Sequence, residues 1–135
     1  MEATGLKLRT RKFALTVIAF VEALPKDESS RVLGRQLLRS GTSVGANYRS
    51  AKRARSNADF ISKMGIVEEE ADECGYWLEL LTESGKVSAA TSASLLKEAG
   101  ELVAIAVASI NTARGGPREL RSEEHKTRKA PLREP

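Results

Sequence analysis

A periodic run of apolar residues in the middle of the chain limits the fold more than any other feature of the sequence. Its members recur at alternating spacings of four and three, and they are Phe60, Met64, Val67, Ala71, Cys74, Leu78 and Leu81. In a helix this spacing gathers the side chains into one seam, like the a and d positions of a heptad. Such a helix must bury its seam against other helices.

Start and stop signals place three more helices around this one. Pro25 ends a first helix, because the residue before proline disfavours helical geometry. The seam helix begins at Ser56-x-x-Asp59, which is similar to a capping box, and Gly85 stops it. Ser88 is a suitable N-cap for the last helix. The predicted helices cover residues 6–24, 30–55, 56–85 and 88–114.

The other three helices carry apolar stripes of their own. These are Phe13, Val17, Phe20, Val21 and Leu24 in the first, Leu33, Leu37, Ser40, Val44, Tyr48 and Ala51 in the second, and Leu95, Ala99, Leu102, Ala106 and Ile110 in the fourth. Only 4% of the residues are aromatic, which suits helices packed through small and aliphatic side chains. We predict an all-α protein, an antiparallel up-down-up-down four-helix bundle over residues 1–114. Residues 115–135 are predicted to form a disordered, flexible, basic charged tail. A break at residues 40–43 that splits the second helix is the alternative.

The sequence also bears on location. Cys74 is the single cysteine, so an intramolecular disulfide and a zinc cluster are excluded, and a reducing cytoplasm fits. Four basic residues near the N-terminus precede an apolar segment and superficially mimic a secretion signal: Lys7, Arg9, Arg11 and Lys12. That segment is amphipathic and carries Glu22, which argues against a signal. The most apolar run, residues 102–110, is about half of what a membrane span needs. We expect a cytoplasmic protein with no membrane partner.

Charge is distributed unevenly along the chain. Residues 1–55 hold twelve Lys or Arg and four acids, whereas residues 56–114 hold four Lys or Arg and ten acids. The last 21 residues hold six Lys or Arg and four acids. This asymmetry indicates either a face that binds a polyanion or complementary surfaces that meet within or between subunits.

The second predicted helix has a basic face that is the leading candidate for a functional site. Its members are Arg31, Arg35, Arg49, Lys52 and Arg53. An arginine can donate two hydrogen bonds to one phosphate, so this face is a candidate RNA- or DNA-binding surface. The alternatives are a solvated face and salt bridges to the acidic third helix. Few aromatic residues lie among these cations, so stacking on single strands is not indicated.

Another face of the second helix carries Gly34, Gly41 and Gly45, which suggests close approach by another backbone. Helical placement puts Leu15 and Ile18 off the stripe of the first helix, and it puts Trp77 beside the seam. We consider these six residues candidates for an oligomer interface, with ordinary packing in the monomer as the alternative for Trp77.

Enzymatic chemistry has weaker support. Glu69-Glu70-x-x-Glu73 fits the EExxE pattern of nucleotide pyrophosphohydrolases resembling MazG, and Glu98-x-x-Glu101 could supply the downstream carboxylates. However, a seam through Val67 and Ala71 directs Glu69 and Glu73 outward. The only histidine, His125, lies in the tail, so a ferritin-like di-iron site fails. We expect no catalytic residue, metal, cofactor or small-molecule substrate.

Several short segments together resemble a known family. They are RSGTSVGAN at 39–47, AKRA at 51–54, ADFISKM at 58–64, EADE at 70–73 and YWLELL at 76–81. These segments are similar to those of the 23S rRNA intervening sequence proteins, a family of bacterial four-helix bundles. Departures are Ser50, where the family commonly has Glu, and Gly65, where it has a stronger helix former. The resemblance implies a protomer that assembles into a homopentamer. We therefore expect a non-enzymatic, homo-oligomeric scaffold that binds nucleic acid, with a protein-interaction scaffold as the alternative.

Overall fold

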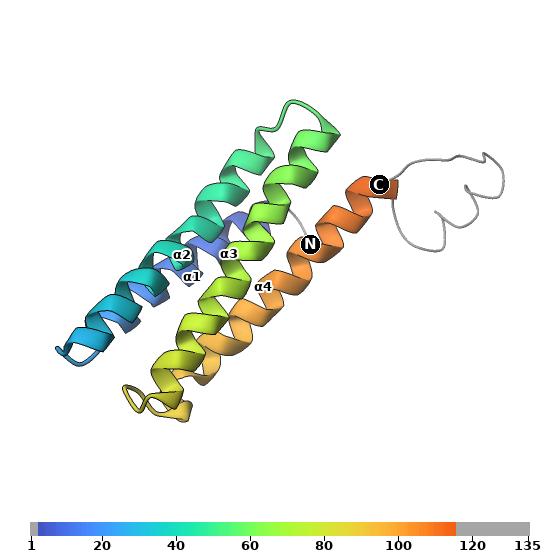
Figure 1. Ribbon diagram of the computed structural model, residues 1–135. Helices are drawn as coiled ribbons and strands as arrows, with labels where there is room; N and C mark the ends of the chain where they lie inside the picture. Colours follow the sequence, from blue (N-terminus) through green and yellow to red (C-terminus); the bar gives the residue numbers. More distant parts are fainter. Residues whose placement is uncertain (1–2, 116–135) are drawn as a thin grey trace.

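The computed structural model describes residues 3–115, which form four helices in an antiparallel up-down-up-down bundle (Figure 1). The helices are α1 (Ala3–Glu22), α2 (Glu28–Lys52), α3 (Asn57–Glu83) and α4 (Ala89–Gly115). The predicted all-α four-helix fold is confirmed. Gly115 belongs to α4, and the rest of the predicted tail lies outside the described residues.

Helix α2 starts earlier than predicted because Asp27 caps it. The Asp27 carboxylate accepts a hydrogen bond from the Ser30 N–H at 2.9 Å, so the helix begins at Glu28. It runs without a break through residues 40–43, so the alternative of a split helix is wrong. Hydroxyls in this stretch donate to carbonyls one turn back, as Ser43 does to Arg39 O at 2.7 Å. Such bonds let serine and threonine remain inside a helix.

The boundaries of α3 and α4 follow the predicted caps. Ser56 Oγ accepts from the Asp59 N–H at 3.0 Å, while the Asp59 carboxylate accepts from the Arg55 N–H at 3.4 Å. Gly85 has a φ of 82°, a left-handed conformation that suits glycine at a helix end. Ser88 Oγ accepts from the Thr91 N–H at 3.1 Å and begins α4.

The predicted seam forms the centre of the core. All of its members except Phe60 are at most 2% exposed, and Phe60 is half-buried at the edge. The α4 stripe is buried throughout, as are most of the predicted core residues of α1 and α2. Leu33, Phe20 and Val21 are only partly buried against this core, while Leu6 joins it. Within residues 3–115, no helix is long and apolar enough to cross a membrane.

The glycine face of α2 packs against α1 of the same chain. A Cβ atom at Gly41 would lie 2.8 Å from Val17 Cγ1, and one at Gly45 would lie 3.2 Å from Thr10 Oγ1. At Gly34 the nearest atom is Leu24 Cδ1, at 2.9 Å. The expected close approach is therefore present, and within this chain its partners are α1 and Leu24, which follows it. The assignment of Gly34, Gly41 and Gly45 to an oligomer interface stays a prediction.

The interface between α1 and α4 has the fewest contacts of the four interfaces between adjacent helices. Most contacts join helices that follow each other along the chain, and α1 meets α4 in few places. Ion pairs cross this interface, since Arg9 donates to Glu98 at 2.6 Å and to Glu101 at 2.5 Å. Part of the charge asymmetry of the sequence is thus neutralised within the chain.

Candidate functional site

A basic groove lies between α1 and α2 at the end of the bundle where α2 turns into α3. It has a volume of about 570 Å³, and α1 and α2 both supply cations to it. The cations are Lys7, Arg11, Arg49, Lys52 and Arg53. Between them lie smaller or buried groups, including Thr10, Gly45 and Tyr48. We call this the α1–α2 groove.

A second basic groove, of about 690 Å³, lies on the other side of α2, against the start of α3. We call this the α2–α3 groove. The charged residues that line it are Arg49, Arg53, Arg55, Asp59 and Lys63. Arg49 and Arg53 line both grooves together with Ala46, so the last turns of α2 form a ridge between them. We refer to Ala46, Arg49 and Arg53 as the α2 ridge.

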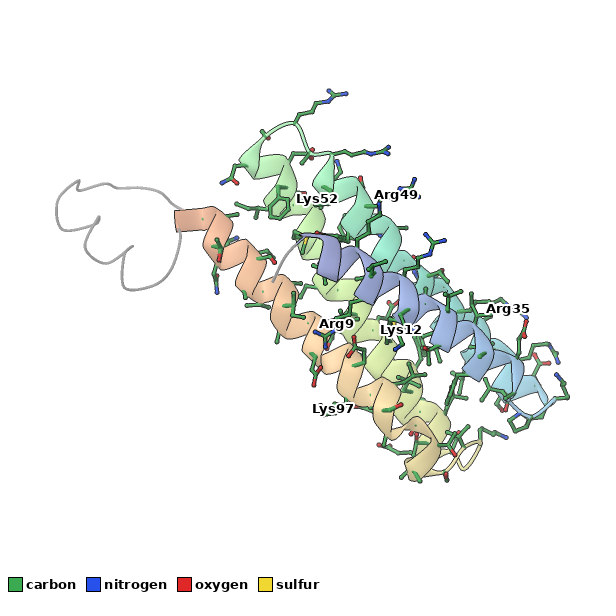
Figure 2. All side chains as sticks on the ribbon, turned by 180° about the vertical axis from the view of Figure 1, so that it is seen from behind. Arg9, Lys12, Arg35, Arg49, Lys52 and Lys97 are labelled. Carbon is green, nitrogen blue, oxygen red and sulfur yellow. The ribbon has the colours of Figure 1, made fainter. Side chains whose placement is uncertain are left out.

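The antiparallel topology explains why these cations gather. The first turns of α1 lie beside the last turns of α2, and the absence of a side chain at Gly45 lets α1 approach closely. Ser56 then caps α3 and turns the chain back, which brings Lys63 near the end of α2. In Figure 2 the labelled Arg49 and Lys52 lie at this end of α2, whereas Arg35 lies toward the other end.

The α1–α2 groove is electrostatically uncompensated. Among residues 3–115, no carboxylate lies within ion-pair distance of any of its five cations. In the α2–α3 groove, Lys63 donates to Asp59 at 3.1 Å, and this contact holds the pKa of Asp59 below its usual range. A structural role also exists for Arg49 and Lys52. They occupy the last turn of α2, where positive charge stabilises the helix dipole.

The structure brings together three of the five predicted nucleic-acid-binding residues. Arg49, Lys52 and Arg53 line the α1–α2 groove. Arg35 is exposed and lines neither groove, and at 1.5 Å per residue it lies about 21 Å along the axis from Arg49. Arg31 pairs with Glu28 one turn away.

Sequence reasoning missed the contribution of α1. Lys7 and Arg11 were noted as basic residues, yet the structure places them in the groove. Their spacing of four puts them on one face of a helix, and antiparallel pairing with the second helix places that face near Arg49. The helical spacing and the antiparallel pairing together could have predicted that Lys7 and Arg11 lie near Arg49. Arg9, between them in sequence, points to α4 instead (Figure 2).

The acidic residues considered for catalysis are divided between two helix interfaces, that of α2 with α3 and that of α1 with α4. Glu70 and Glu73 accept hydrogen bonds from Arg39 of α2, whereas Glu98 and Glu101 accept from Arg9 of α1. The two carboxylate pairs therefore face different helices and do not converge. Over residues 3–115, no group of three or more His, Cys, Asp or Glu side chains could hold a metal ion.

Cys74 is a core residue, as predicted. Its side chain is fully buried, and its thiol donates to Ser40 Oγ at 3.4 Å. Burial raises the pKa of this thiol to about 11. Because the thiolate is the nucleophilic form, the buried thiol is chemically inert in the native state.

The remaining candidates for an oligomer interface differ in exposure. Leu15 is 59% exposed, whereas Ile18 and Trp77 are partly buried. Tyr76 is also largely exposed, and its ring meets that of Trp77 edge to face at 5.0 Å. The indole N–H of Trp77 is buried and has no hydrogen-bond partner among residues 3–115.

Comparison with known proteins gives the same family as the sequence segments between residues 39 and 81. A family model described as 23S rRNA-intervening sequence protein matches residues 6–108. Among solved structures, the chain is similar to a protein of unknown function from the S23 ribosomal protein family of Bacteroides thetaiotaomicron. The two are 35% identical with a TM-score of 0.77, and the match covers 83% of this chain and 100% of the other. No curated protein matches the chain.

Proposed function

Because the chain belongs to the 23S rRNA-intervening sequence protein family, we propose that it is a non-enzymatic, homo-oligomeric scaffold that binds nucleic acid at the end of α2. The similar protein of the S23 family is itself of unknown function, and the support for this proposal comes from the geometry of this chain. We place its action in the cytoplasm, where a lone thiol such as Cys74 stays reduced.

One observation carries the proposal. Five cations from two helices converge on the α1–α2 groove, and none of them has a carboxylate partner within the described part of the chain. Uncompensated like charges repel each other, so such a cluster is costly unless an anion neutralises it. Arginine forks bind phosphate with two parallel hydrogen bonds, and lysine ammonium groups bind it as point charges.

The proposed self-association uses two complementary sides of the bundle. Exposed Leu8 and Leu15 of α1 lie one turn either side of exposed Lys12, which is outside the α1–α2 groove, whereas exposed Tyr76 of α3 accompanies exposed acids. Those acids are Glu69, Asp72, Glu79 and Glu83. A contact between unlike faces is heterologous and closes into a ring when the rotation allows. The family resemblance suggests five subunits. Light scattering at micromolar concentration should give an oligomer that Leu15→Glu weakens, and a monomeric parent protein would refute the assembly.

The nucleic-acid proposal is tested by fluorescence anisotropy with structured RNA and duplex DNA over a salt series. Binding should weaken steeply with salt, because each neutralised phosphate contributes about −0.9 to the slope of log K against log salt on duplex DNA. The variant Arg49→Glu/Arg53→Glu should lower the magnitude of that slope by about two and lose most of the affinity.

The matched control is Arg31→Glu/Arg35→Glu, which makes the same charge change on the same helix outside the grooves. It should lose much less affinity than Arg49→Glu/Arg53→Glu. Equal losses in the two variants would show that net charge, rather than the grooves, drives binding. No binding at low salt would refute the proposal.

A protein-interaction scaffold is the second candidate, and exposed Tyr76 favours it. An aromatic side chain that is 54% exposed beside Trp77 is a typical anchor for a protein partner. This function predicts that Tyr76→Ala abolishes partner capture while Arg49→Glu/Arg53→Glu has no effect on it.

A further inference from the structure

The α2 ridge and its flanking grooves have the form of a helix bordered by two cationic tracks. Ala46, Arg49 and Arg53 line both grooves, so the ridge is continuous with each of them. Ala46 contributes only a methyl group, which allows a ligand to approach the helix closely. A single anionic strand would occupy one groove and leave the other empty. Two parallel phosphate tracks would fill both.

The cations are present on both sides of the ridge but in unequal strength. The α1 side holds Lys7, Arg11 and Lys52 without a carboxylate among the groove residues. The α3 side holds Arg55 and Lys63, and Lys63 is partly neutralised by Asp59. The tighter phosphate contacts therefore belong on the α1 side.

We propose that the preferred ligand is B-form double-stranded DNA, with the α2 ridge in the major groove and one phosphate backbone along each basic groove. This inference rests on the proposed nucleic-acid binding and narrows it to one class of ligand. An α-helix with its side chains is about 10–12 Å across, and the major groove of B-DNA is about 12 Å wide and admits one. The two backbones that border this groove then meet the cations on either side of α2.

The same geometry disfavours the other nucleic acids. The major groove of A-form RNA is deep and too narrow for an α-helix, and its minor groove is shallow. Proteins that hold single strands stack bases on aromatic side chains. Among the described residues, the one aromatic residue that lines either groove is Tyr48, which is only 5% exposed. This part of the chain therefore offers no aromatic surface in the grooves for stacking.

Three probes of equal length and identical dye test the preference by anisotropy at one salt concentration. They are a DNA duplex, an RNA duplex of the same sequence, and one of the DNA strands. The full chain should bind the DNA duplex at least tenfold more tightly than either other probe. Equal or tighter binding of the RNA duplex or the single strand overturns the inference while leaving the proposed function standing. Failure to bind any probe refutes both.

Chemical protection tests where the ridge lies. Guanine N7 is exposed in the major groove, so a saturating amount of protein should protect it from dimethyl sulfate in the DNA duplex. Unprotected N7 atoms in a fully bound duplex overturn the placement of the ridge.

Charge-reversal variants test whether each groove binds one phosphate backbone. Lys7→Glu/Arg11→Glu should weaken duplex binding at least tenfold, and Arg55→Glu should weaken it less, because the α3 side is partly neutralised. Arg31→Glu/Arg35→Glu, with the same charge change as the first variant, should change affinity less than threefold. Circular dichroism and light scattering confirm that each variant folds and assembles. If Lys7→Glu/Arg11→Glu and Arg31→Glu/Arg35→Glu weaken binding equally, the assignment of a phosphate backbone to the α1–α2 groove is overturned.

Discussion

Replacing Gly41 with alanine tests how closely α1 and α2 pack. The new methyl carbon would lie 2.8 Å, 3.0 Å and 3.1 Å from Cγ1, Cγ2 and Cβ of Val17, a side chain with no exposed surface. Val17 holds essentially one rotamer in a helix and cannot turn aside, so α1 itself must shift. Overpacking of this kind costs about 1–3 kcal/mol. Removing a glycine from a helix interior returns about 1 kcal/mol. The net effect ranges from neutral to a loss of about 2 kcal/mol.

Gly65 of α3 provides the reference, because a Cβ atom there would have no described heavy atom within 4 Å apart from its chain neighbours and the adjacent backbone of its own helix. Gly65→Ala should gain the helix-propensity term of about 1 kcal/mol alone. The Gly41 variant should therefore be less stable than the Gly65 variant by the crowding term, about 1–3 kcal/mol. Gly75→Ala is a second reference with equally open surroundings.

Urea unfolding followed by circular dichroism measures the difference, at one protein concentration because the proposed self-association would add to the apparent stability. Val17→Ala should relieve the crowding, so that adding Gly41→Ala to it costs less than in the parent chain. A double-mutant cycle gives this coupling, which should exceed about 0.5 kcal/mol. If Gly41→Ala proves as stable as Gly65→Ala, the close packing of α1 on α2 is refuted.

Two further predictions concern pH, and a third concerns the buried thiol. The Ser30 N–H lowers the pKa of Asp27, Lys63 lowers that of Asp59, and Lys97 lowers that of Glu101. The folded state thus favours these carboxylates in their charged form. The urea midpoint should therefore hold steady above about pH 5 and fall as the pH drops through about 4. A urea midpoint that stays constant down to about pH 3 would contradict this. In the opposite direction, an unfolded thiol has a pKa of about 8.5, whereas burial in the fold raises the pKa of Cys74 to about 11. Stability should therefore decline from about pH 8.5 upward, and Cys74→Ala should have a shallower decline. Ellman's reagent should modify Cys74 only after denaturation, and rapid reaction of the native protein would show that the thiol is accessible.

The parts of the fold that depend on local sequence were predictable. The seam of α3, the stop at Gly85 and the caps at Ser56 and Ser88 are each determined by a few neighbouring residues, and the structure confirms them. The start of α2 was less predictable, because two serines at 29 and 30 competed with Asp27 for the capping position. Capping strengths of these residue types are nearly equal, so the sequence alone does not choose among them.

The parts that depend on which helix lies beside which were predictable only in outline. The glycines of α2 signalled a close contact, but the identity of the contacting helix is a tertiary property. The basic face shows the same limit. A helical projection places Arg35 and Arg49 at similar angles and ignores the axial distance of about 21 Å between them. It also cannot show that Lys7 of another helix completes the groove around Arg49.

The sparse contact between α1 and α4 also bears on how the chain folds. Since nearly all helix packing joins neighbours along the sequence, most native contacts close short loops, and closing the first helix on the last adds few long-range contacts. Folding rates rise as contacts become more local, and helical bundles of this kind fold within about microseconds to milliseconds. The chain can therefore assemble as successive helical hairpins, with α1 free to dock onto α2 without waiting for α4.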